Sequence, residues 1–280
     1  MIKKNIPNSI TCCNLISGCI ATYFAFCNDL TMALTWIIIG AVFDFFDGMS
    51  ARALHVSSPI GKELDSLADD VTFGVAPSTM IFSELGVMNY PSAVEGLRTI
   101  LPFVAYIMAA FSALRLAKFN LDTRQTMGFI GLPTPANALF WGGLLIGMQP
   151  VIETREWAMP IVVIGVFFSS WLLISELPMF ALKFKHWGWQ GNQLRYSFVA
   201  TAAAIFIIAI IAHGWKGFLE AWAPVIALYL IICVIAQLNG KKAQKEGYRL
   251  KITKRDKKRL KRLCTTDSPQ TFKPFPVYRY

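Results

Sequence analysis

Two pairs of aspartates lie in segments that are apolar enough to cross a membrane. Asp44 and Asp47 belong to the first segment, Asp65 and Asp69 belong to the second, and a short loop separates the two. A carboxylate near the centre of a bilayer costs roughly 2.5–3.5 kcal/mol even on insertion scales that give low penalties. Four of them need compensating charge, which divalent cations would supply. We therefore expect the active site in this region.

The rest of the chain has the composition of a helical membrane protein. Of its 280 residues 55% are hydrophobic, and the apolar runs are continuous, whereas a transmembrane β-barrel would show short strands of alternating polarity. We expect an all-α, polytopic integral membrane helix bundle of about eight transmembrane helices. Their expected positions are residues 9–27, 32–54, 61–83, 100–119, 134–151, 157–179, 194–213 and 217–238.

The distribution of Lys and Arg predicts the orientation and the domain division. With both termini in the cytoplasm, the inner connections before the tail carry ten of these residues and the outer connections carry three. Positive charge favours the cytoplasmic side, so we expect a multi-pass protein of the cell membrane. Asp47 and Asp65 then lie roughly 10 and 6 Å from the cytoplasmic loop. Residues 1–239 form the expected catalytic domain, with its motif at 44–69 and its site open to the cytoplasm.

Residues 240–280 form a basic tail, which we expect in the cytoplasm. Between Lys241 and Arg262 the chain has twelve Lys or Arg among 22 residues. A basic run directly after a membrane span favours binding to anionic membrane lipids. Nucleic-acid binding is the alternative for such a run, and its position beside the membrane makes lipid the better interpretation.

The spacing of the aspartates predicts that their side chains converge. Each set shares one helical face: Asp44, Asp47, Gly48 and Ala51 on the first, and Gly61, Asp65 and Asp69 on the second. Ligands that are all oxygen favour Mg²⁺ or Mn²⁺, and such ions commonly assist phosphoryl transfer. Two alternatives remain open from spacing alone: structural ion pairs with Lys or Arg, and the ion pathway of a cation transporter.

The motif carries a family resemblance. The pattern Asp44-x2-Asp47-Gly48-x2-Ala51-Arg52-x8-Gly61-x3-Asp65-x3-Asp69 matches, at every defined position, the signature of the CDP-alcohol phosphotransferases. The resemblance implies the fold of that family and a homodimer. It also implies an enzyme in which an alcohol attacks a CDP-linked lipid and CMP is released.

By this resemblance the four aspartates share two functions. Asp44, Asp47 and Asp65 would bind divalent metal, Mg²⁺ or Mn²⁺, as two ions. Asp69 would bind metal or act as the general base on the attacking hydroxyl. The residue types suit these roles, because metal neutralises a diphosphate and a carboxylate can activate a neutral hydroxyl.

The same resemblance implies a nucleotide pocket beside the metals. Gly48, Ala51 and Gly61 would let the cytidine and the diphosphate lie close to the backbone. Arg52 suits either a substrate phosphate or a structural carboxylate partner.

The first helix also offers polar side chains. Asn8, Thr11 and Asn14 fall three residues apart and could line the nucleotide pocket. Capping and hydrogen bonds between helices are the alternative. Asp70 lies about 100° round the helix from Asp69, away from the expected metal face, and we interpret it as structural.

Three segments beyond the aspartates indicate which alcohol is used. Residues 66–77, 113–120 and 131–136 resemble blocks of the bacterial phosphatidylserine synthases of this family. This resemblance implies that the phosphatidyl group passes from CDP-diacylglycerol to L-serine, giving phosphatidylserine and CMP. Glycerol 3-phosphate or an inositol compound is the alternative acceptor.

Serine carries a carboxylate, which needs a cation close to the metals. Arg115 lies in an otherwise apolar segment on the cytoplasmic side, and we expect it to bind the serine carboxylate or a substrate phosphate. A snorkelling arginine at a helix end is the alternative. Lys118 stands where the resembling block has arginine, which keeps the charge but loses a bidentate donor. We include Lys118 among the candidate substrate-binding residues.

Overall fold

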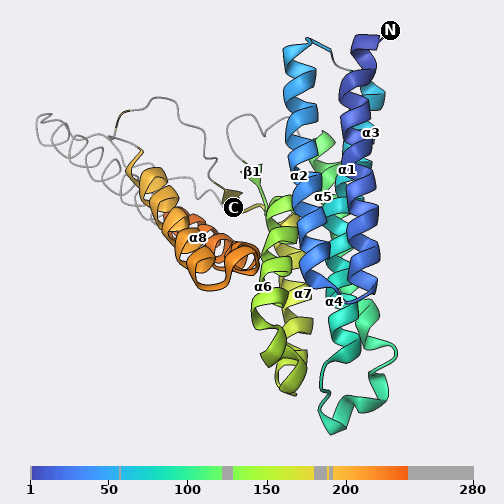
Figure 1. Ribbon diagram of the computed structural model, residues 1–280, viewed down its shortest axis with the longest axis vertical. Coiled ribbons are helices and arrows are strands. Elements are labelled where there is room, and N and C mark those ends of the chain that lie inside the picture. The colour runs from blue at the N-terminus through green and yellow to red at the C-terminus, as the bar shows by residue number, and fades with distance from the viewer. Residues whose placement is uncertain (1, 57, 122–128, 180–187, 189–191, 239–280) are drawn as a thin grey trace, which may run out of the picture. The chain divides into compact units, whose positions relative to one another are not determined.

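The computed structural model describes residues 2–56, 58–121, 129–179, 188 and 192–238 (Figure 1). The chain divides into two units, residues 1–233 and 234–280, and the helices that carry the aspartates belong to the first unit. The basic tail, residues 240–280, lies outside the described residues, so its expected role stays a prediction.

The described part of the chain is helical apart from one pair of two-residue strands, as the composition predicts. In chain order the elements are α1 (Ile2–Phe26), α2 (Leu30–Ala53), α3 (Pro59–Asp69), the π-helix η1 (Asp70–Val75), α4 (Ala76–Val87), the 3₁₀ helices η2 (Ser92–Leu97) and η3 (Leu101–Ala105), α5 (Tyr106–Leu121), β1 (Phe129–Ile130), α6 (Thr134–Thr154), α7 (Ala158–Ile174), β2 (Pro178–Met179) and α8 (Gln193–Glu220). A further apolar helix covers Trp222–Leu238.

Four described helical segments are long and apolar enough to cross a membrane: Asn5–Phe26, Leu30–Ala53, Leu101–Leu121 and Gln193–Glu220. This supports a membrane protein, although the sequence predicts about eight spans. The difference has local causes. The expected span 61–83 is built from three consecutive helical pieces, and α7 has only 17 residues. Gly214, at φ 58°, breaks α8 close to the expected boundary between the last two spans.

The first two helices form an antiparallel pair. Asn28 has a left-handed backbone with φ 57° between them, which asparagine tolerates better than most residues. Asp29 then caps α2, because its side chain accepts a hydrogen bond from the Met32 amide at 3.0 Å. Figure 1 shows α1 and α2 side by side, with the start of α1 and the end of α2 at the same end of the molecule. This arrangement brings the aspartates of α2 beside the first turns of α1.

The π-helix η1 follows Asp69 directly and packs against α1 and α2 at two glycines. A Cβ on Gly18 would lie 2.8 Å from the Cα of Thr72, and a Cβ on Gly40 would lie 2.6 Å from its Cγ2. The Thr72 hydroxyl donates a hydrogen bond to the Asn14 carbonyl at 3.1 Å. Short π-helical segments often occur at functional sites. Here the glycines allow the backbone next to Asp69 to approach α1 closely.

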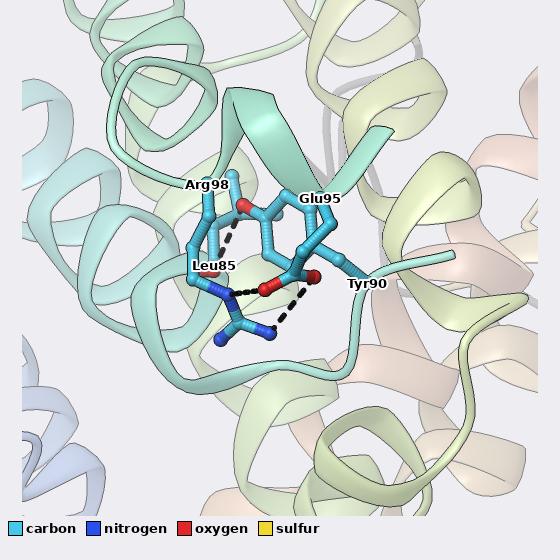
Figure 2. Close-up of polar contacts among 4 residues, drawn as sticks. All are labelled: Leu85, Tyr90, Glu95 and Arg98. Atoms are coloured by element: carbon cyan, nitrogen blue, oxygen red, sulfur yellow. Dashed lines mark hydrogen bonds and ion pairs between the residues drawn. The ribbon is translucent and has the colours of Figure 1, made fainter. Parts of the chain in front are cut away.

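At the opposite end of α4 from η1, the connection to α5 is closed by Tyr90 (Figure 2). Its hydroxyl donates to the Leu85 carbonyl at 3.0 Å, and the Arg98 guanidinium lies 4.8 Å from the centre of its ring. Arg98 also donates to both carboxylate oxygens of Glu95, at 2.7 and 3.3 Å. Burial raises the pKa of the Tyr90 hydroxyl. These contacts fix the C-terminal end of α4.

We predict that Gly18→Ala destabilises the protein. The added methyl group meets the Thr72 backbone, and overpacking of this kind costs about 1–3 kcal/mol. The apparent melting temperature in detergent should fall relative to the wild type. Gly86→Ala is the matched control, because a Cβ there meets no atom within 4 Å and alanine favours a helix. Equal melting temperatures for the two variants would contradict the close packing of η1 on α1.

Candidate active site

Three aspartates from two helices meet at one point. Asp44 and Asp47 come from α2 and Asp65 comes from α3, and one carboxylate oxygen of each lies within 4.8 Å of the others. Asp47 is buried and the other two are half-buried. No cation of the described residues forms an ion pair with any of the three. The predicted convergence is therefore confirmed for these three aspartates, and among the described residues no Lys or Arg pairs with them.

The fourth aspartate lies beside this group. The charges of Asp44, Asp47 and Asp65 all act on Asp69. One of its carboxylate oxygens, Oδ1, accepts a hydrogen bond from the Asn14 side-chain amide at 3.0 Å. Asp69 is thus held by α1 on one side, and its second oxygen is left for another partner.

Helix α1 supplies donors to two of the four carboxylates. The Thr11 hydroxyl lies 2.6 Å from Oδ2 of Asp47 and donates to it, and Asn14 donates to Asp69. Both donors are buried. The sequence suggests that they line a nucleotide pocket. Thr11 does line the pocket described below, Asn14 is not among its lining residues, and the nucleotide itself stays a prediction. Their shared contribution is to orient carboxylates.

A pocket of about 270 Å³ opens next to the three-aspartate group. Its lining comes from α1, α2 and the start of α3: Pro7, Asn8, Thr11, Asp47, Gly48, Ala51, Val56, Ser58, Gly61, Lys62 and Asp65. Of the candidate substrate-binding residues, Asn8, Thr11, Gly48, Ala51 and Gly61 all lie in this wall. Five of the eleven lining residues belong to the motif: Asp47, Gly48, Ala51, Gly61 and Asp65.

The first turn of α3 gives this pocket an electropositive wall. Ser58 caps the helix by accepting a hydrogen bond from the Gly61 amide at 3.0 Å. A Cβ on Gly61 would lie 3.0 Å from both the Ser58 hydroxyl and the Asn8 side-chain oxygen, so glycine keeps this wall open. The amides of a helix N-terminus favour anions. A phosphate in the pocket would meet them.

Lys62 is a pocket cation that the sequence analysis missed. No spacing signal identifies it, because Lys62 lies about 100° round the helix from Gly61, off the face that Gly61 shares with Asp65 and Asp69. Its ammonium donates to the Asn120 carbonyl at 2.7 Å. An ammonium has three donors, so two stay available for a ligand.

Arg115, from α5, is a buried cation. It is 7% exposed, and Asp69 is close enough for its charge to act on the guanidinium. Arg115 makes no ion pair within the described part of the chain, and its Nε is buried without a hydrogen-bond partner. A snorkelling arginine would expose its charged end, so the burial argues against that alternative.

Three further candidates stand apart from the pocket. The side chains of Arg52 and Lys118 are exposed, and neither is among the lining residues. Oδ1 of Asp70 is buried beside Gly74 and Ser112, away from the three-aspartate group. The carboxylate partner considered for Arg52 is not found among the described residues, and the roles of Arg52 and Lys118 stay predictions.

The donor set of the aspartate group fits a hard divalent cation. It consists of carboxylate oxygens alone, three of them within 4.8 Å. Mg²⁺ and Mn²⁺ prefer such ligands, whereas zinc and copper favour sites with nitrogen or sulfur. Carboxylates brought this close repel one another, and a cation between them removes that repulsion.

Comparison with known proteins agrees with this geometry. Residues 4–171 match the CDP-alcohol phosphatidyltransferase family. A CDP-diacylglycerol–serine O-phosphatidyltransferase of Bacillus subtilis (strain 168) is 36% identical over 185 residues, which cover 65% of this chain and 90% of that protein. A protein with the same name from Mycobacterium leprae (strain TN) is 33% identical over 82% of this chain and 70% of that protein. Another, from Methanocaldococcus jannaschii, is 34% identical over 53% of this chain and 62% of that protein. The chain belongs to the CDP-alcohol phosphatidyltransferase family.

Proposed function

We propose that this protein transfers the phosphatidyl group from CDP-diacylglycerol to L-serine, which yields phosphatidylserine and CMP. The observation that carries the proposal is the convergence of Asp44, Asp47 and Asp65, two of which, Asp47 and Asp65, line the pocket. Membership of the family supports CDP-alcohol chemistry, and the names of the relatives support serine as the acceptor. The cation-transporter alternative finds no support, because these relatives are named as transferases.

The proposal includes two divalent ions, Mg²⁺ or Mn²⁺, held by Asp44, Asp47 and Asp65 with Asp69 at the side. When bound, such ions neutralise the diphosphate and the departing CMP. Thr11 would keep the Asp47 carboxylate in one orientation through its hydrogen bond. Gly48, Ala51 and Gly61 would leave room for the cytidine and the diphosphate.

Asp69 is the proposed general base. The serine hydroxyl oxygen attacks the lipid-side phosphorus, its proton passes to Asp69, and the bond from that phosphorus to the bridging oxygen of CMP breaks. Asn14 occupies Oδ1 of Asp69, which leaves Oδ2 to accept the proton. A positioned carboxylate of this kind contributes roughly 10²–10⁴-fold to rate.

Arg115 is the proposed partner of the serine carboxylate. It is buried, lacks a carboxylate partner among the described residues and lies on the Asp69 side of the site. A fixed guanidinium can form two parallel hydrogen bonds with one carboxylate. Lys118 and Arg52 are exposed and would act at the rim, on headgroups or substrate phosphates.

The proposed setting is the cell membrane, crossed about eight times by residues 1–239, with both termini and the site in the cytoplasm. The excess of Lys and Arg in the inner connections supports this orientation. The tail, residues 240–280, would bind anionic lipids. The protein would act as a homodimer, as the family resemblance implies.

We predict that L-serine is the preferred acceptor. Release of labelled CMP from CDP-diacylglycerol should be measured in detergent with L-serine, glycerol 3-phosphate and inositol, each with Mg²⁺ and with Mn²⁺. L-serine should give the highest kcat/KM, and EDTA should abolish release. Preference for another alcohol would contradict the serine assignment. Absence of CMP release with every alcohol would contradict transferase activity.

We predict that Asp65→Asn and Asp69→Asn fail in different ways. Asp65→Asn removes a metal ligand, so the metal concentration for half-maximal activity should rise. Asp69→Asn removes the base, so kcat should fall by roughly 10²–10⁴-fold with little change in that concentration. Asp29→Asn is the control, because Asp29 caps α2 at its other end. A large rise in metal requirement for Asp69→Asn would instead identify Asp69 as a ligand.

We predict that Arg115→Gln weakens serine use selectively. Loss of a hydrogen bond to a charged group costs about 1.5–3 kcal/mol, so kcat/KM for serine should fall by about 10- to 150-fold. The KM for CDP-diacylglycerol should stay close to that of the wild type. Arg98→Gln, which alters an exposed arginine of the α4–α5 connection, serves as the control. An equal rise in both KM values would place Arg115 on the donor phosphates.

A further inference from the structure

Two hydrogen bonds between α3 and α5 and one within α3 form a closed circuit. The Lys62 ammonium donates to the Asn120 carbonyl at 2.7 Å. The Asn120 side-chain amide donates to the Ser66 hydroxyl at 2.8 Å. The Ser66 hydroxyl lies 3.3 Å from the Lys62 carbonyl and can donate to it, one turn back along α3. Each of the three residues therefore contacts both of the others.

This circuit joins the helix that carries the reacting carboxylates to the helix that carries Arg115. Ser66 follows Asp65 directly in α3, and Asn120 lies in the last turn of α5 after Arg115. Within the described residues, no other side-chain hydrogen bond or ion pair connects these two helices. The circuit is thus the polar link that fixes α5 relative to α3.

The C-terminal end of α5 explains why a lysine ammonium binds there. The last carbonyl groups of a helix lack partners inside the helix and carry partial negative charge. Lys62 satisfies one of them, the Asn120 carbonyl. The same residue then uses its side-chain amide to hold Ser66. Both the backbone carbonyl and the side chain of Asn120 are therefore held by hydrogen bonds.

We propose that Lys62, Ser66 and Asn120 are positioning residues that set the place of Arg115 relative to Asp69, and so set the affinity for the acceptor. The proposal rests on the proposed function, in which Asp69 takes the serine hydroxyl proton and Arg115 binds the serine carboxylate. In serine only two carbons separate these two groups, so the two protein groups must stand at one fixed separation. A displacement of about 1 Å in a site of this kind can reduce the rate 10²-fold.

Lys62 differs from the other two because it also lines the nucleotide pocket. Its ammonium can keep the Asn120 carbonyl and still donate to a phosphate in the pocket. Loss of Lys62 should therefore disturb both substrates, whereas loss of Ser66 or Asn120 should disturb the acceptor alone. This contrast distinguishes the effect of the hydrogen-bond circuit on the acceptor from the effect of the pocket wall on the nucleotide.

The test compares Ser66→Ala and Asn120→Asp with the wild type in detergent. Asn120→Asp keeps the size of the side chain but removes its donor. Each change should raise the KM for serine about five- to tenfold and leave the KM for CDP-diacylglycerol within about twofold. Ser66→Thr, which keeps the hydroxyl, should restore the wild-type KM. Lys62→Met should raise both KM values.

Controls and a double variant separate positioning from general damage. Asn89→Ala removes an exposed bond to the Thr154 carbonyl at the other end of the protein, and it should change neither KM. Asn120→Asp in an Arg115→Gln background should add no further increase in the serine KM, because the residue it positions is absent. Full additivity of the two changes would overturn the proposal.

Failure of the positioning proposal can be distinguished from failure of the proposed function. If the wild type uses serine and the Ser66 and Asn120 variants keep its KM, the positioning proposal is wrong and the function stands. If the wild type prefers another acceptor, the function is wrong, and the same KM comparison on that acceptor decides the positioning role. If the variants raise both KM values and also lower the thermal stability, and Ser66→Thr does not restore them, the three residues have a structural role only.

Discussion

Repulsion among carboxylates is the constraint on which this structure depends. Asp44, Asp47 and Asp65 lie within 4.8 Å of one another, and their charges reach Asp69 as well. Water screens such repulsion poorly in a half-buried place. Holding the carboxylates together therefore costs free energy unless bound cations offset the repulsion. The surrounding helices therefore have to hold the carboxylates in place without neutralising them. Hydrogen-bond donors meet this requirement, whereas lysine or arginine partners would compete with the cations.

Helix α1 meets this requirement although it contributes no carboxylate. Thr11 and Asn14 each donate to one aspartate, and the Asn14 carbonyl accepts from Thr72 of the π-helix that follows Asp69. Asn14 thus connects the side chain of Asp69 with the side chain of Thr72, three residues further along. Gly18 permits the close contact on which this bond depends. A single face of α1 therefore positions one proposed metal ligand, Asp47, and the proposed base, Asp69.

The spacing of the motif predicted what helical periodicity controls and missed what tertiary contacts control. The convergence of the aspartates, and the places of Gly48 and Gly61 in the pocket wall, follow from residues three and four apart on a helix. The contact of Asn14 with Asp69 could not be predicted, because it spans 55 positions and requires the π-helix. The burial of Arg115 likewise depends on how α5 packs, which no local pattern encodes.

Donor and acceptor recognition are divided between different helices. The pocket beside the aspartates is lined by α1, α2 and the start of α3, and these segments carry the whole CDP-alcohol motif. Because that motif serves CDP-alcohol transfer as such, it cannot by itself select one alcohol. Selection must come from groups outside it, and the proposed partner of the serine carboxylate, Arg115 of α5, is such a group and is buried. Under the positioning proposal, the bonds that fasten α5 to α3 at Asn120 then matter for the choice of acceptor as well as the residues that touch it.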